Sequence, residues 1–165
     1  MNETALLTEA FGRIQQVVHR AVDGLDDDQL ARRIDDRGNS IAWLVWHLSR
    51  IQDDHVAAVA DHPQAWHAGG WADRFDLPFD PDATGYGHGS DDVAAVRASA
   101  GLLLGYYDAV QEQTIEYLRG VSADDLDRVV DENWDPPVTL GVRLISVLAD
   151  DLQHAGQAAF IRGLL

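Results

Sequence analysis

Four long stretches of this chain repeat apolar residues at three- and four-residue steps, the period of a helix with one buried face. The first runs from about Glu3 to Val22, the second from Ile41 to about Ala60, the third from Ser90 to Gly120, and the last from Thr139 to about Gly163. No strand signal competes with them. This pattern predicts an all-α four-helix bundle. With 165 residues the chain has the length of one domain, so we expect a single domain over residues 1–165.

The second helical segment should be the most buried of the four. Its apolar residues occur nearly all round the helix, and Ser40 can cap its first turn. Short helical turns are expected after Asp26 and within residues 122–131, and the two prolines of residues 133–139 predict an extended segment before the last helix.

Residues 61–90 show neither the apolar period of a helix nor the alternation of a strand, and they are rich in Gly, Pro, Asp and aromatic residues. We therefore expect a long loop between the second and third helices. A loop of this length inside a compact domain is usually functional or disordered, and its aromatic content favours packing. We expect it to form the wall of a pocket, with Trp71 and Tyr86 as ligand contacts.

The composition excludes several classes of partner and site. The formal net charge of −16 argues against nucleic-acid binding, which depends on Lys and Arg neutralising phosphates. No stretch approaches the ~18 apolar residues of a membrane span and no signal sequence is recognisable, so we expect a cytoplasmic protein without a membrane partner. Cysteine is absent. Any thiol in the chemistry must therefore come from a ligand.

Two buried histidines form the candidate site. Asp150 and His154 are four residues apart on the last helix, which places them on one face at a spacing that can share a metal ion. His47 lies within WLVWHL of the second helix, where a bundle would turn it inward. Two imidazoles and one carboxylate leave open positions on a divalent ion, as in catalytic zinc sites. A hydrogen-bonded core histidine and an ion pair between Asp150 and His154 are the alternatives.

The order of elements, the HL pair at residues 47–48 and the HAGQ run at residues 154–157 resemble the DinB-like (YfiT-like) superfamily of metal-binding four-helix bundles. The resemblance covers essentially the whole chain. It implies metal ligands at His47, Asp150 and His154. The middle ligand is His in many members and Glu in the branch similar to mycothiol-dependent maleylpyruvate isomerase, whereas this chain has the shorter Asp.

The same resemblance implies a reaction class. Proteins of that branch use a divalent metal, zinc or nickel being the expected ions, to favour the thiolate of a low-molecular-weight thiol. Mycothiol, a thiol of actinobacteria, is the thiol implied here. We therefore expect a thiol-dependent S-transferase or isomerase acting on a small electrophile, and a homodimer as in the family. The alternatives are a non-catalytic or stress-associated metal-binding module and a purely structural dimer.

Three further residues are candidates for binding the substrate. Arg50 and Arg143 can neutralise the metal carboxylate or hold an acidic group of the ligand, with surface salt bridging as the competing interpretation. Gln157 lies beside His154 and can orient a ligand or pack in the core. Asp54 is a candidate acceptor for a histidine N–H.

Overall fold

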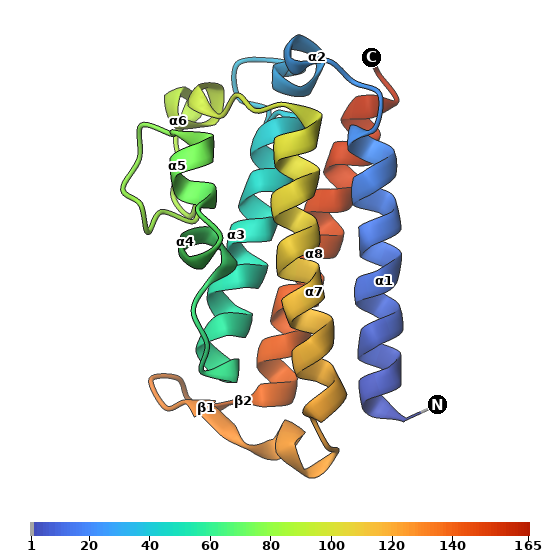
Figure 1. Cartoon of the computed structure of the whole chain (residues 1–165), viewed down its shortest axis with the longest axis vertical. Coiled ribbons are helices and arrows are strands. Elements are labelled where there is room, and N and C mark those ends of the chain that lie inside the picture. The colour runs from blue at the N-terminus through green and yellow to red at the C-terminus, as the bar shows by residue number, and fades with distance from the viewer. Residues whose placement is uncertain (1) are drawn as a thin grey trace.

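The structure, a computed structural model, describes residues 2–165, and four long helices form its body (Figure 1). These are α1 (Glu3–Val22), α3 (Ile41–Ala60), α7 (Ala100–Gly120) and α8 (Leu140–Arg162). The shorter elements are α2 (Asp27–Ala31), α4 (Ala65–Ala68), α5 (Trp71–Phe75), α6 (Ser90–Ala95), a 3-10 turn η1 (Asp124–Asp127), and strands β1 (Val129–Asp131) and β2 (Val138–Thr139). The predicted all-α four-helix bundle is confirmed.

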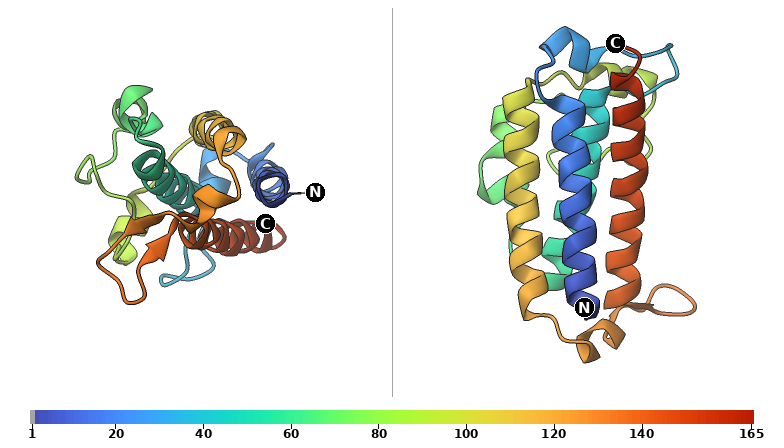
Figure 2. Two further views of the ribbon diagram at one scale, coloured as in Figure 1. Left: turned by 90° about the horizontal axis from the view of Figure 1, so that it is seen from below. Right: turned by 90° about the vertical axis from the view of Figure 1, so that its right-hand side faces the viewer.

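The long helices pack in the cyclic order α1, α7, α3, α8, so that α1 and α3 are diagonal to one another (Figure 2). α1 and α8 run in one direction along the bundle, and α3 and α7 run in the other (Figure 1). Because α3 and α7 are parallel, the chain between them must return along the length of the bundle. Residues 61–99 make this return, which explains why the connection is long.

α3 is the most buried helix, as predicted. Every residue from Ile41 to Arg50 is buried, because α7 and α8 pack on two sides of α3 and the returning segment covers another. The Ser40 side chain accepts a hydrogen bond from the Trp43 amide at 3.1 Å and caps the first turn. Although α3 is largely apolar, no helix within residues 2–165 is long and apolar enough to cross a membrane.

The returning segment contains more regular structure than the sequence predicts. The short helices α4 and α5 lie in the stretch expected to be loop. Asp53 of α3 explains the first of them, since its carboxylate accepts hydrogen bonds from the amides of Ala65 at 2.9 Å and Trp66 at 2.8 Å. A side chain twelve residues upstream thus satisfies the amino end of α4.

The third predicted helix is divided in two. Residues 96–99 separate α6 from α7, with Val96 leaving the helical region at φ −78° and ψ 98°. Val96 and Ala98 bury their side chains in the core across this break, and Ser99 caps α7 by accepting from the Leu102 amide. Strand β2 lies at the end of the predicted extended segment, and it pairs antiparallel with β1, whose residues were expected to belong to a helical turn.

One buried carboxyl has no partner. Asp151 is fully buried in α8, and neither of its side-chain oxygens is hydrogen bonded among residues 2–165. The hydroxyl of Tyr107 is buried and unpartnered as well. Burial, and secondarily the charge of Asp150, raise the pKa of the Asp151 carboxyl well above its usual range.

We predict that Asp151 makes the bundle less stable as the pH rises. Above pH ~4 the unfolded chain releases this proton while the folded chain keeps it, so stability falls by up to about 1.4 kcal/mol per pH unit until the folded-state pKa is reached. Asp151→Asn should remove this dependence and gain stability relative to the natural chain between pH 5 and 8. Urea unfolding in the presence of a chelator measures the effect. Exposed Asp73→Asn is the control, and parallel stability curves for the Asp151 variant and the natural chain would contradict the prediction.

Candidate metal centre

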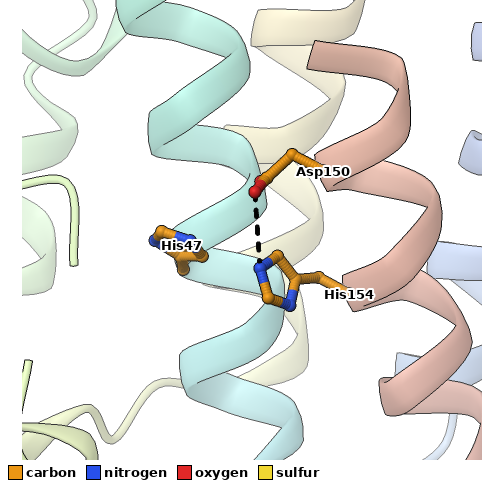
Figure 3. Close-up of side chains that lie close together, drawn as sticks. All are labelled: His47, Asp150 and His154. Carbon is orange, nitrogen blue, oxygen red and sulfur yellow. Dashed lines mark ion pairs between the residues drawn. The ribbon is translucent and has the colours of Figure 1, made fainter. Parts of the chain in front are cut away.

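His47, Asp150 and His154 come together where α3 packs against α8 (Figure 3). Each offers one ligand atom, and these three atoms all lie within 4.8 Å of one another. His47 is buried, whereas the other two are half-buried. The two side chains that lie four residues apart on α8 therefore meet the side chain of His47 on the inward face of α3.

His47 is held by the returning segment. Its Nδ1 donates a hydrogen bond to the main-chain carbonyl of Thr84 at 2.6 Å, because a carbonyl oxygen can only accept. The indole of Trp43 stacks on the imidazole, with ring centroids 4.6 Å apart and an angle of 15° between the planes. The remaining nitrogen, Nε2, keeps its lone pair in this neutral tautomer.

His154 is oriented in the same way by Gln157. The His154 Nδ1 donates to the Gln157 Oε1 at 2.9 Å, and the His154 Nε2 lies 3.5 Å from the Asp150 Oδ1 (Figure 3). Ligating histidines in proteins commonly donate their second N–H to such an oxygen, which fixes the tautomer and the direction of the ring. Both imidazoles of the site show this arrangement.

Asp150 supplies the third donor. Its Oδ2 is buried and has no hydrogen-bond partner within residues 2–165. A buried carboxylate oxygen without a partner is costly, and a cation is one group that would satisfy it. Despite being one methylene shorter than Glu, Asp150 reaches the two histidines. The donor set fits a divalent ion of the kind that imidazole and carboxylate bind.

The two predicted arginines have different surroundings. Arg50 is fully buried rather than at the surface, and within residues 2–165 its guanidinium donates to groups outside the triad. Arg143 is half-buried and donates to the Asp131 carboxylate at 2.9 Å, and its Nη1 lies 3.2 Å from the Nδ1 of His55. Both of these contacts of Arg143 are therefore to groups outside the triad, and the expected salt bridge is the one with Asp131.

The structure separates Trp71 from the triad. Its indole packs against Tyr106 of α7 and lies under the guanidinium of Arg74. Trp71 also lines a groove with Glu112 and Glu116, none of whose lining residues belongs to the triad. Tyr86, in contrast, is 90% exposed and directly follows the glycine that lies against His47.

Sequence reasoning missed the main-chain partner of His47. Asp54, a candidate acceptor for a histidine N–H, instead accepts from Gln64 and lies near His55. The actual acceptor, the Thr84 carbonyl, is 37 residues away in the chain. A main-chain group leaves no signature in the sequence. Trp43, one helical turn before His47, is the local signal of an aromatic side chain packed on the imidazole.

The two histidines differ in basicity. Burial lowers the pKa of His47, and the Thr84 carbonyl offsets this only in part. Burial also lowers the pKa of His154, but hydrogen bonds with Asp150 and Gln157 and the charge of Asp150 outweigh it, so this pKa is raised above 6.5.

We therefore predict that His154 takes up a proton before His47 as the pH falls. A proton on Nε2 of His154 competes with any metal, so metal affinity should decrease as the pH drops through the raised pKa of His154. Asp150→Asn should lower the pKa of His154. NMR titration of the histidine ring signals in metal-free protein tests both statements, and protonation of His47 first would contradict the assignment.

Comparisons with known proteins agree with this architecture. A family model described as Mycothiol-S-transferase matches residues 6–165. The crystal structure of a conserved protein from Enterococcus faecalis is similar, with a TM-score of 0.92, 29% sequence identity, and coverage of 99% of this chain and 97% of that one. A comparison with curated proteins found no match. The family model spans nearly the whole chain, and the chain therefore belongs to the mycothiol-S-transferase family of DinB/YfiT-like helical bundles.

Proposed function

We propose that this protein is a divalent-metal-dependent transferase that joins the sulfur of a mycothiol-like thiol to a small electrophile. Membership of the mycothiol-S-transferase family supports the reaction class. The observation that carries the metal dependence is the convergence of His47, Asp150 and His154, with the Nδ1–H of each imidazole already donated to an oxygen. Zinc or nickel is the expected ion, since imidazole nitrogen suits both.

The residues of the site have distinct parts in this proposal. A divalent ion bound there would supply the positive charge that makes a coordinating thiol lose its proton at neutral pH. Gln157 keeps His154 in one tautomer, and Trp43 packs on His47 and meets His154 edge-on at 6.2 Å between centroids. In the transfer, the sulfur forms a bond to the electrophilic carbon, and the leaving group departs with the electron pair of the bond that breaks.

The rim of the site supplies the contacts for the two substrates. Tyr86 is an exposed aromatic side chain next to the segment that holds His47, so we assign it to the electrophile or to the thiol. We also assign Arg143, whose Nη1 lies 3.2 Å from the Nδ1 of His55, to an acidic group of the ligand. Trp71 would act indirectly, by packing the returning segment onto α7.

We predict that single ligand variants separate metal binding from folding. His47→Ala and His154→Ala should each weaken zinc binding by about 100-fold or more. Loss of a residue that only hydrogen bonds to a metal ligand already weakens metal binding by about 10–100-fold. His19→Ala is the matched control, because His19 is a half-buried histidine of α1 that pairs with Asp108. Calorimetry on untagged protein gives the affinity, and fluorescence of bimane-labelled mycothiol, formed from mycothiol and monochlorobimane, gives the turnover.

These measurements also distinguish the alternative functions. Zinc bound at the triad without any thiol transfer would favour a non-catalytic metal-binding module. Equal zinc affinity in the histidine variants and the natural protein would show that zinc does not bind at the triad.

We further propose a homodimer formed through α8. Its outward face carries exposed apolar or small residues at three- and four-residue steps, the pattern of a helix–helix seam: Val142, Ile145, Ala149, Leu152, Gly156 and Phe160. None of the charged residues of α8 between Leu140 and Ile161 belongs to this outward face. Asp151 is buried, Arg143 pairs with Asp131, and Asp150 faces His154. Two chains of charge −16 repel each other, so an uncharged face is where copies of this chain can meet.

We predict that Leu152→Asp prevents this association. A charge at the centre of an apolar seam should weaken a dimer by about 2 kcal/mol or more. Leu6→Asp on α1 is the matched control, since both leucines are 61% exposed. Sedimentation at micromolar concentration measures the effect. A natural protein that sediments as a monomer, or equal effects of the two substitutions, would contradict the proposed interface.

A further inference from the structure

Residues 82–88, which we call the strap, are fastened to one face of α3 by three side chains. Arg50 donates to the carbonyls of Asp82 and Ala83, His47 donates to the carbonyl of Thr84, and the Trp43 indole N–H donates to the Nδ1 of His88 at 3.2 Å. Positions 43, 47 and 50 are four and three residues apart and therefore share a face. The strap thus runs antiparallel to α3, with His47 at the middle fastening point.

Arg50 holds the strap from inside the protein. Its guanidinium is fully buried and lies 3.1 Å from the Ala83 carbonyl oxygen, 3.5 Å from that of Asp82, and 2.8 Å from the Gln64 amide oxygen. Asp53, also buried, provides the opposite charge at 3.8 Å. Taking this charge out of water is costly. The main-chain carbonyls it binds immediately precede the one that accepts from His47, so Arg50 fixes the stretch of chain on which the orientation of His47 depends.

The position of the strap against α3 also requires a glycine at residue 85. Its φ of +93° lies in the left-handed region, and a Cβ at this position would stand 2.7 Å from the Nδ1 of His47 and 3.0 Å from the Trp46 ring. Any other residue would push the strap away from the helix. The close approach that lets the Thr84 carbonyl reach His47 therefore depends on the missing side chain of Gly85.

We propose that Arg50 and Gly85 are positioning residues for His47: they press the strap onto α3, so that the Thr84 carbonyl holds the Nδ1–H of His47 and directs its Nε2 toward Asp150 and His154. The consequence for the triad rests on the proposed metal function, whereas the hydrogen bond itself exists in the protein without metal. Gly85 also lies against Trp43 and Trp46. A displacement of the strap would therefore change the packing of these two indoles as well as the orientation of His47.

The Nδ1–H signal of His47 in metal-free, ¹⁵N-histidine-labelled protein tests this proposal directly. The variants are Gly85→Ala, which displaces the strap, and Arg50→Lys, which keeps the charge opposite Asp53 but cannot bind both carbonyls and Gln64. Thr84→Ala is the matched control, because it removes a side chain and keeps the main-chain carbonyl. Arg74→Lys is the second control, since Arg74 is exposed and stacks on Trp71.

We expect both test variants to remain helical by circular dichroism, to lose the protected Nδ1–H signal of His47, and to retain that of His154. Their zinc affinity should fall by about 10–100-fold, while both controls keep the signal and the affinity of the natural protein. A folded Gly85→Ala or Arg50→Lys protein that keeps the His47 signal overturns the proposal. If one variant fails to fold, the other decides it in the same way. Absence of zinc binding by the natural protein would instead refute the proposed function, and the NMR comparison would still decide the role of the strap.

Discussion

The contact between α3 and α8 is the constraint on which the candidate site depends. A helix fixes the spacing of Asp150 and His154, but only the packing of its partner brings His47 opposite them. Both helices are long and firmly packed in the bundle. Ligands on such rigid elements are held more accurately than ligands on loops, which suits a centre that needs three side chains at one point.

The parallel course of α3 and α7 shapes the other side of the site. It requires a long return of the chain outside the bundle, and that return supplies the strap, the Thr84 carbonyl and the exposed Tyr86. The same stretch is tied to the core by buried polar groups, since Asp53 binds two amides of α4 and the hydroxyl of Tyr106. The connection demanded by topology therefore also carries the carbonyl that holds His47 and the exposed aromatic side chain next to it.

The acidic residues of this chain have sharply different environments. Most are exposed and give the large negative charge, which the outward face of α8 avoids. Asp53 is buried and fully hydrogen bonded, whereas Asp151 is buried without a partner. Asp150, adjacent to Asp151, turns toward the two histidines. Successive side chains on a helix point in directions about 100° apart. Asp151 can therefore point into the core while its neighbour Asp150 points toward the two histidines.

The sequence by itself determined the four long helices, the cap at Ser40, and the shared face of Asp150 and His154, because each depends on residues within a few positions of one another. The break at residues 96–99, the burial of Arg50 and the acceptor for His47 were decided only by the tertiary structure. The hydrogen bonds from Arg50 to Asp82 and Ala83 and from His47 to Thr84 join residues more than 30 positions apart, and their acceptors are main-chain carbonyls that every residue has. Local periodicity carries no information about such partners, so the helices could be predicted, whereas the hydrogen bonds that orient the site could not.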